Sequence, residues 1–215
     1  MNADLFIKRV LMFNGLIREI AEVISFSGNF LNLKAKYRPD LGDSISVNGA
    51  CLSVVKLFND GFCVELSAET RKILALENFK NRVHIEPAMC LGDRIDGHLL
   101  QGHIDFIGSI TKINKNENGT DFFVRLTPEA MKFVANKGSI GIDGISLTIN
   151  EIMDQINEIR LTIIPITMKN TLFGEFYIGR KVNVETDLLM RYVARALNFK
   201  KGLTWEQVER FSNLF

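Results

Sequence analysis

Long apolar runs are absent from this sequence of 215 residues, although 47% of its residues are hydrophobic and 24% are charged. No segment approaches the roughly 18 apolar residues that a membrane-spanning helix needs. The N-terminal segment carries Lys8 and Arg9 where a secretory signal peptide has its apolar region. These absences speak against a membrane or secreted protein, so we expect a cytoplasmic protein that contacts no membrane.

An excess of charge of either sign is also missing, because 26 basic and 25 acidic residues leave a net charge of +1. The basic footprint of a nucleic-acid-binding protein is therefore not visible, and we expect no nucleic-acid partner. The three cysteines, Cys51, Cys63 and Cys90, have a number and spacing that fit neither a disulfide framework nor a zinc site. Phosphate loops, dinucleotide fingerprints and the Ser-His-Asp order are likewise absent, which excludes the common catalytic templates.

What the sequence does contain is an internal repeat. Residues 137–148, KGSIGIDGISLT, repeat residues 42–53, GDSISVNGACLS, in altered form at a constant shift of 95 positions. In both copies alternating apolar residues precede an Asn-Gly or Asp-Gly pair, which is typical of two strands joined by a tight turn. A second match, at a shift of 87, pairs residues 15–17 with residues 102–104. We infer that one module is used twice.

Each half continues through short alternating apolar segments about eight to twelve residues apart with glycine turns between them, which favours a small closed β-barrel in each half. Thr186 and Asp187 can cap a C-terminal helix whose apolar residues recur at helical spacing up to Leu197. With no further core to cover, this helix either packs on a barrel or mediates self-association. The predicted boundaries are an extension at 1–11, barrels at 12–98 and 99–186, and a helix with tail at 187–215.

Small polar side chains follow the predicted turn in both copies. They are Cys51 and Ser53 in the first copy, and Ser146 and Thr148 in the second. Because the members of each pair are two apart on a strand, they share one face and point into the same space. They are candidates for a functional site, and the alternative is that they are ordinary polar residues of an edge strand.

The three histidines occupy positions of different kinds. His84 aligns with Asn183 inside a strand, which favours a structural role, and His98 lies in the Gly-rich join between the halves, where it can satisfy backbone groups. His103 replaces Leu16 of the other copy, so a polar residue stands where the first half has an apolar one. This exchange makes His103 a candidate functional residue, with a structural role left open.

Five short motifs stand in one order along the chain: MFNG at 12–15, NGACLS at 48–53, GHLLQGH at 97–103, the repeat at 137–148 and IPIT at 164–167. Together they resemble riboflavin synthase of the α-chain type, from residue 12 to about residue 197. The resemblance implies an all-β fold of two similar six-stranded antiparallel Greek-key β-barrels in tandem, with a C-terminal helix that gathers three chains into a homotrimer. It implies no metal and no organic cofactor, and it suggests lumazine synthase as a further partner.

The reaction implied by the resemblance is a dismutation. Two molecules of 6,7-dimethyl-8-ribityllumazine exchange a four-carbon unit and give riboflavin and 5-amino-6-ribitylamino-2,4(1H,3H)-pyrimidinedione. A duplicated barrel offers two similar pockets, and holding two identical molecules together replaces a bimolecular encounter by a positioned one. The main alternative is a non-catalytic lumazine- or flavin-binding protein of the antenna type, which needs only one pocket, whereas both halves keep their polar residues here. The neutral charge speaks against a third alternative, a barrel that binds oligonucleotides.

Roles for individual residues follow from the resemblance at matching positions. His103, or a water held by Ser146, is a predicted proton acceptor, and Asp187 is predicted to orient or polarise from the start of the last helix. The alternative for Asp187 is an ordinary helix-terminal carboxylate. Which barrel binds the donor is left open. The predicted catalytic residues are His103, Ser146, Thr148, Cys51 and Asp187; the predicted substrate-binding residues are Gly15, Leu16, Ile17, Cys51, Leu52, Ser53, Glu65, Glu69, Thr70, Gly102, His103, Ile104, Lys137, Ser146, Leu147, Thr148, Ile163, Ile164, Pro165, Ile166, Thr167 and Met168.

Three positions depart from the pattern of the resembled family. Asn14 and Ser53 stand where threonine is usual, and both keep hydrogen-bonding capacity. Ile166 stands where a polar residue is common, which removes one polar contact from the second pocket without affecting the predicted chemistry.

Overall fold

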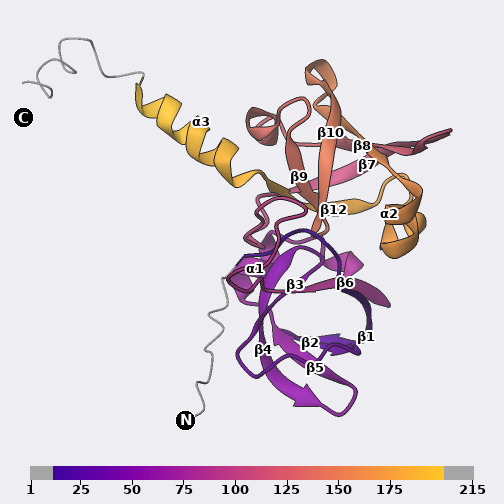
Figure 1. The fold of residues 1–215 in the computed structure, drawn as a ribbon, viewed down its shortest axis with the longest axis vertical. Helices are drawn as coiled ribbons and strands as arrows, with labels where there is room; N and C mark the ends of the chain where they lie inside the picture. Colours follow the sequence, from indigo (N-terminus) through magenta and orange to yellow (C-terminus); the bar gives the residue numbers. More distant parts are fainter. Residues whose placement is uncertain (1–11, 201–215) are drawn as a thin grey trace, which may run out of the picture.

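The computed structural model describes residues 12–200, except for the side chains of 198–200. The predicted extension at 1–11 and the part of the predicted tail beyond Lys200 lie outside these residues. Within them, twelve strands form two closed barrels of six strands each, one above the other in Figure 1. All strand pairs are antiparallel, which confirms the predicted fold class.

The two barrels have the same ring order once equivalent strands are matched. The first ring runs β1-β2-β5-β4-β3-β6, and the second runs β10-β11-β8-β7-β12-β9. The strands of the first are β1 (Glu19–Ser27), β2 (Phe30–Lys34), β3 (Ser44–Val47), β4 (Ala50–Phe58), β5 (Gly61–Glu65) and β6 (Arg82–Pro87). Those of the second are β7 (Phe106–Asn116), β8 (Gly119–Arg125), β9 (Ser139–Ile142), β10 (Ile145–Met153), β11 (Glu158–Ile163) and β12 (Lys181–Thr186).

Short helices close the barrels, and one longer helix follows them. Helices α1 and α2 occupy equivalent places, each before the last strand of its barrel in chain order. The helices are α1 (Ala68–Lys72), α2 (Pro165–Asn170), α3 (Leu188–Lys200) and the 3₁₀ turns η1 (Leu76–Asn78), η2 (Ala130–Phe133), η3 (Asp154–Ile156) and η4 (Leu172–Glu175).

The repeated turn forms the same hairpin in both halves. Val47 pairs with Ala50 across the first turn, and Ile142 pairs with Ile145 across the second. Both turn residues have positive φ, 44° and 86° in the Asn-Gly turn and 45° and 83° in the Asp-Gly turn. These angles fit a type I′ turn, whose twist matches that of the flanking strands.

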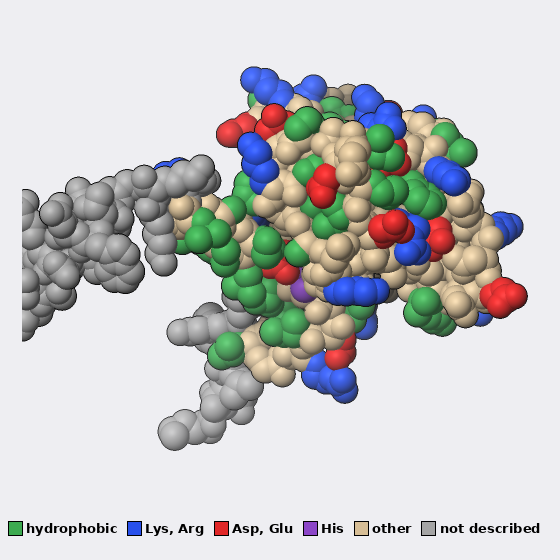
Figure 2. Space-filling view, turned by 90° about the horizontal axis from the view of Figure 1, so that it is seen from above, with side chains coloured by type: hydrophobic (Ala, Val, Ile, Leu, Met, Phe, Trp, Pro, Cys, Tyr) green, Lys and Arg blue, Asp and Glu red, His purple; other side chains and the backbone are tan. Residues whose placement is uncertain are grey.

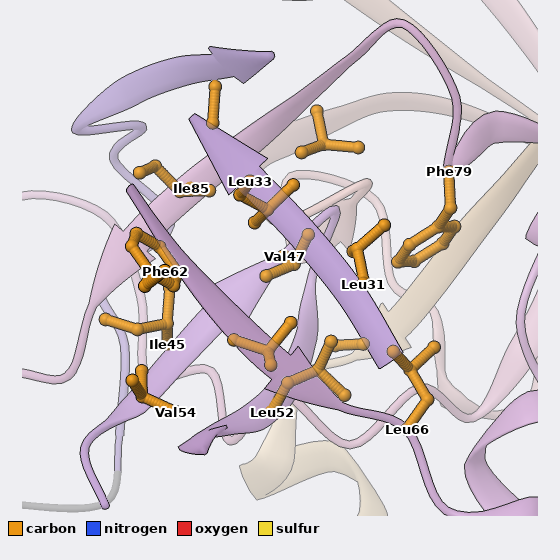
Figure 3. Packing of buried hydrophobic residues seen from close by; sticks show 14 of the residues in the cluster. Leu31, Leu33, Ile45, Val47, Leu52, Val54, Phe62, Leu66, Phe79 and Ile85 are labelled. Carbon is orange, nitrogen blue, oxygen red and sulfur yellow. The ribbon is translucent and has the colours of Figure 1, made fainter. Parts of the chain in front are cut away.

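Alternate residues of the strands fill each barrel. In the first barrel Leu31 and Leu33 from β2 meet Ile45 and Val47 from β3, and Figure 3 shows these side chains converging with Phe62. All five are fully buried. Burying a side chain of this size contributes about 1.5–3 kcal/mol, so the closed ring stabilises the scaffold that carries the loops.

Two equivalent glycines meet where the barrels touch. A Cβ on Gly144 would lie 2.8 Å from the Gly49 nitrogen, and a Cβ on Gly49 would lie 2.7 Å from the Gly144 nitrogen. Real Cβ atoms do not approach a backbone nitrogen this closely, so the contact requires glycine on both sides. The two hairpin tips thus mark a pseudo-twofold axis between the halves.

Buried polar side chains surround this axis in equivalent pairs. The Asn48 side chain accepts the His84 N–H at 2.9 Å, and the Asp143 carboxylate accepts the Asn183 N–H at 2.7 Å. Across the interface, His84 Nδ1 lies 3.1 Å from the Asp143 carbonyl oxygen, while Asn183 Nδ2 donates to the Asn48 carbonyl at 2.8 Å. His84 and Asn183 therefore each hydrogen-bond to the hairpin turn of their own half and to the hairpin turn of the other half.

His84 is held as a neutral imidazole in this network. Its Nε2 accepts the Leu172 N–H at 2.8 Å, as Asn183 Oδ1 accepts the Ala75 N–H at 2.8 Å. Because Nε2 accepts, the proton resides on Nδ1 and donates to the Asp143 carbonyl. Complete burial lowers the pKa of His84 to about 4. The arrangement supports the structural role predicted for this histidine.

Helix α3 extends away from the two barrels (Figure 1). The Asp187 side chain accepts the Leu189 N–H at 2.8 Å, so Asp187 caps its first turn as predicted. Apolar side chains along the helix remain uncovered within one chain, as Figure 2 shows, with Leu189 68% exposed and Leu197 59% exposed. Among residues 12–200, the helices are all too short or too polar to cross a membrane.

Candidate active site

Two short segments cross between the barrels, and we call them the first strap (residues 13–17) and the second strap (residues 100–104). They meet at their starts, where Phe13 N–H donates to the Leu100 carbonyl at 2.7 Å and Leu100 N–H donates back at 3.0 Å. Phe13 and Leu100 are 87 positions apart, the shift that the sequence repeat predicts. The straps are therefore related by the same pseudo-twofold axis as the hairpins.

Each strap lies on the barrel of the other half. Ser146 N–H of β10 donates to the Gly15 carbonyl at 2.9 Å, and Cys51 N–H of β4 donates to the Gly102 carbonyl at 2.8 Å. Beyond these contacts, Ile104 is part of the first barrel's core, and Ile17 packs against the second. Both candidate pockets are consequently built from residues of both halves.

Glycine is required at these crossings. Gly15 and Gly102 have φ of +75° and +73°, which side chains rarely adopt. A Cβ on either residue would also clash with the strand below it. The nearest atoms are the Cβ of Ser146, at 2.5 Å, and the Cβ of Cys51, at 2.6 Å. The close approach places each strap directly over a predicted catalytic side chain.

A buried glutamate anchors each strap. Glu86 at the end of β6 accepts the N–H groups of Asn14 and Gly15 at 2.7 and 3.0 Å. Glu185 at the end of β12 accepts those of Gln101 and Gly102 at 2.6 and 2.9 Å. Burial raises the pKa of both carboxyl groups to about 7, although the N–H donors act in the opposite direction.

The second barrel carries a cleft of about 190 Å³ beneath the first strap. Leu16 and Ile166 supply apolar walls, while Ser146 and Thr167 supply hydroxyl groups. Ile166 forms an exposed apolar edge of this cleft. The complete lining is Gly15, Leu16, Ile17, Ile145, Ser146, Ile166, Thr167, Asn170 and Thr171.

Ser146 contacts His98 in this cleft. His98 Nδ1 lies 2.7 Å from Ser146 Oγ, and the two can exchange a proton along this contact. A Cβ on Gly97 would lie 3.0 Å from Ser146 Oγ, so the residue before His98 must be small. Asn14 holds this loop, because its Oδ1 accepts the Gly97 N–H at 2.8 Å and its Nδ2 donates to the Arg94 carbonyl at 2.9 Å.

The environment of His98 keeps its ring neutral near physiological pH. Burial lowers the pKa of His98, and the negative charge of Asp187 opposes this shift. Its Nε2 is buried without a hydrogen-bond partner in the described chain. A neutral imidazole of this kind can accept a proton from the serine, with Asp187 stabilising the positive charge that forms.

The first barrel presents a different set of groups at the equivalent place. Cys51 lies beneath the second strap, and burial raises the pKa of its thiol, with a further increase from the charge of Glu185. His103 follows Gly102 in that strap and is exposed. Ser53 pairs with Glu65 across β4 and β5. This side therefore offers a neutral thiol and an accessible imidazole.

His103 and Ser146, which were predicted as alternative sources of the proton acceptor, lie on different barrels. His103 lies with Cys51 on the first barrel, and Leu16 lies with Ser146 on the second, because the straps are exchanged. The partner of Ser146 is His98, which the sequence analysis had interpreted as structural.

The remaining predicted residues lie at several places on the two barrels. Thr148 is exposed on β10 and pairs with Ser139, next to Lys137, which has a φ of 63°. Thr70 lies inside α1, and its N–H donates at 3.0 Å to the hydroxyl of Ser67, which caps this helix. The predicted turn at 164–167 begins α2, with Pro165 at its first position. Of the others, Leu52 and Ile163 are buried in the barrels, Leu147 and Met168 are partly buried, and Glu69 and Ile164 are exposed.

Three residues at the candidate site were missed by sequence reasoning: His98, Glu86 and Glu185. A signal did exist for the glutamates, since VHIE at 83–86 and VNVE at 182–185 both end an apolar strand with an acid. Within residues 12–200, no group of three or more His, Cys, Asp or Glu side chains is arranged to hold a metal ion.

Comparison with known proteins assigns this architecture to a family. The family profile described as the lumazine binding domain matches residues 14–88 and again residues 101–187. The chain therefore belongs to the lumazine-binding domain family and contains two copies of its domain.

Within this family, the chain is similar to riboflavin synthases. It is 33% identical to riboflavin synthase from Photobacterium phosphoreum over 196 residues, covering 86% of this chain and 89% of that relative. It is 35% identical to riboflavin synthase from Bacillus subtilis (strain 168), covering 87% of this chain and 90% of that relative. These relatives place the chain among the riboflavin synthases, which makes it a transferase.

Solved structures show the same fold. LumP complexed with riboflavin has a TM-score of 0.72 at 21% identity, covering 81% of this chain and 98% of that chain. LumP complexed with 6,7-dimethyl-8-(1'-D-ribityl) lumazine has a TM-score of 0.70 at 20% identity over the same shares.

Proposed function

We propose that the protein catalyses the dismutation of two 6,7-dimethyl-8-ribityllumazine molecules by transfer of a four-carbon unit. The products are riboflavin and 5-amino-6-ribitylamino-2,4(1H,3H)-pyrimidinedione, and no external oxidant or reductant is needed. The observation that carries this proposal is the pair of pseudo-equivalent strap contacts, Gly15 on Ser146 and Gly102 on Cys51, which place different polar side chains at equivalent positions of the two barrels. Two identical molecules held in unlike sites can take the unlike roles of donor and acceptor.

The chemistry divides between removing a proton and adding a nucleophile. One substrate loses a proton from its position-7 methyl group, and the other is attacked at position 7. The His98–Ser146 pair, with a contact of 2.7 Å, suits proton transfer on the second barrel. Cys51 and His103 are the groups available on the first barrel, and Thr148 and Asp187 lie at the margin of the second.

The substrate lies, in this proposal, between chains of a cytoplasmic homotrimer. A cleft of about 190 Å³ is smaller than the roughly 300–1,000 Å³ of typical small-molecule sites, so one chain alone leaves the bound ring partly uncovered. The exposed apolar face of α3 supplies a surface for assembly. Lumazine synthase remains a predicted partner on the strength of the family resemblance.

Turnover of the substrate tests the reaction directly. The purified protein is mixed with 6,7-dimethyl-8-ribityllumazine, and riboflavin is measured by its absorbance. We expect riboflavin to form without an added metal or organic cofactor. Lumazine that stays bound but unchanged would instead support a ligand-binding protein of the antenna type.

Assembly is tested with matched surface variants. The double variant Leu189→Ser, Val193→Ser is expected to be monomeric, which sedimentation measures. We also expect it to form little riboflavin. The control is Ile178→Ser, which removes a side chain of similar exposure, 62% against 68% for Leu189, from a loop of the second barrel. If the double variant sediments like the control, α3 does not assemble the chains.

A further inference from the structure

Arg191, on the first turns of α3, contacts three side chains that belong to the second half. Its Nη1 lies 2.9 Å from Asp105 Oδ1, and its Nη2 lies 3.1 Å from Gln101 Oε1 and 3.6 Å from Glu185 Oε1. The Arg191 side chain is 23% exposed, and that of Glu185 is 3% exposed. The guanidinium thus closes a mostly buried network rather than a surface ion pair.

The three partners hold the second strap at both ends. Glu185 accepts the N–H groups of Gln101 and Gly102, at the start of the strap. Asp105, just past its end, accepts both the N–H and the hydroxyl of Thr186 at 2.8 Å. Arg191 therefore links helix α3 to both attachments of the strap.

The second strap is the part of the chain that lies over Cys51 on the first barrel. Gly102 accepts the Cys51 N–H at 2.8 Å, and the next residue is His103. A displacement at Gln101 or Asp105 is passed to these residues because only three positions lie between the two anchors. The position of α3 and the position of the candidate catalytic groups are consequently coupled through one side chain.

The first half lacks this connection. Glu86 makes the same two strap contacts as Glu185, but Gly92 stands 99 positions before Arg191, the shift that separates the two glutamates. Within the described chain, no ion pair of Glu86 is formed, and a cleft of about 500 Å³ opens beside it. The arginine link is therefore an addition to the repeat, confined to the strap that carries His103.

We propose that Arg191 is a positioning residue that fixes the second strap over the first barrel, so that docking of α3 sets the placement of Gly102 and His103 at the candidate site. Arg191 touches no reacting group and acts through Glu185, Gln101 and Asp105. The catalytic consequence rests on the function proposed above, whereas the effect on the strap does not.

The protonation of Glu185 provides a readout that distinguishes positioning from general stability. Three groups face this carboxyl: Arg191 lowers its pKa, Asp105 raises it, and the Cys51 thiol lies beside it. A protonated Glu185 is a poorer acceptor for the two strap N–H groups. Removing Arg191 should therefore move the acid side of the pH–rate profile to higher pH, because Glu185 loses the cation that favours its charged form.

The experiment compares full-length Arg191→Met and Arg191→Lys with Arg125→Met. Arg125 also pairs with a buried glutamate of the second barrel, Glu158, at 2.6 Å, but lies on β8 rather than at a strap. We expect amide hydrogen exchange of residues 101–103 to be about tenfold faster in Arg191→Met, with residues 14–15 unchanged. Arg191→Lys should give an intermediate exchange rate at residues 101–103, and Arg125→Met should give the wild-type exchange rate. Turnover should fall about tenfold in Arg191→Met, with the shifted acid limb.

Three results would overturn the proposal: unchanged exchange at 101–103 in Arg191→Met, equal acceleration in both straps, or acceleration only in samples that sedimentation shows to be dissociated. If the wild-type protein makes no riboflavin, the proposed function fails, but the exchange measurement still decides whether Arg191 holds the strap.

Discussion

The two barrels have the same ring order, the same hairpin and the same strap, but the straps lie against different side chains. Beneath the first strap lie Ser146 and His98, with Leu16 as an apolar wall. Beneath the second strap lies Cys51, with His103 alongside. The backbone framework is thus repeated with its hydrogen bonds, while the groups that could carry chemistry differ. The comparison shows that the repeat fixes where two ligands are held and that individual side chains decide what each site does.

The contact between the hairpin tips is the most sensitive point of this symmetry. We expect Gly144→Ala to destabilise the protein by more than about 3 kcal/mol, because its Cβ would combine positive φ with a 2.8 Å approach to Gly49. Gly42→Ala is the control, since Gly42 has nearly the same φ, +85° against +83°, with open space around it. It should cost only about 1 kcal/mol. Urea unfolding at fixed protein concentration measures the free energy of unfolding of both variants. Equal losses of stability would show that the contact between the two glycines is not tightly constrained.

Replacing His84 by Asn would make the two halves alike at the interface. Because the folded-state pKa of His84 is lowered to about 4, the unfolded chain binds the extra proton first as the pH falls below about 6.5. This lowers the stability of the wild type by about 3 kcal/mol between those pH values, and Asn has no such dependence.

At pH 8 we expect His84→Asn to cost about 1–3 kcal/mol, because the shorter asparagine side chain leaves space beside Leu172 and lengthens the hydrogen bond from its N–H. The difference between the two proteins should narrow or reverse toward pH 4. Measuring the difference cancels the contributions of Glu86 and Glu185, which both proteins share. A difference that stays constant with pH would mean that His84 is not buried neutral.

Removing the proton-transfer pair tests the assignment of the second cleft. Ser146→Ala and His98→Ala are each expected to lower turnover by about 100-fold, and the double variant by little more than either, since the two side chains act together. Unfolding measurements should show that the fold is kept. Additive losses would indicate that the two residues do not share one step.

Giving the second strap the residue that the first strap has at the equivalent position is the change with the smallest expected effect. His103→Leu gives both straps the same residue, and we expect turnover to fall about tenfold if the imidazole takes part at the first barrel. Leu16→Ala, at the equivalent place on the other strap, is the control and should change the rate less. Near-normal turnover of His103→Leu would assign the chemistry to the second cleft alone.

Local patterns in the sequence were sufficient to predict the repeated elements of the fold. The Asn48-Gly49 and Asp143-Gly144 pairs predicted the hairpins, and the alternating apolar residues around them predicted strands, because both signals depend on neighbouring residues only. The Asp187 cap followed in the same way.

The pairing of site residues could not be predicted by these means. Gly15 and Ser146 are far apart in the sequence, and no periodicity reports that their segments touch. His98 lies in a Gly-rich join without any repeat pattern, so its contact with Ser146 becomes visible only when the first strap and the loop before it are in place. Arg191 stands off the apolar stripe of its helix, which suggests a solvent-facing residue until Glu185 and Asp105 are seen beside it.

The exchange of the straps has a consequence for the origin of the protein. A single-barrel ancestor would have exposed a strap with nowhere of its own to dock, but two copies related by a twofold axis would each have accepted the strap of the other. Such an ancestral homodimer would have had two identical catalytic pockets. A duplication that joined the subunits would have kept these contacts and would have let Cys51 and Ser146 diverge by independent mutation.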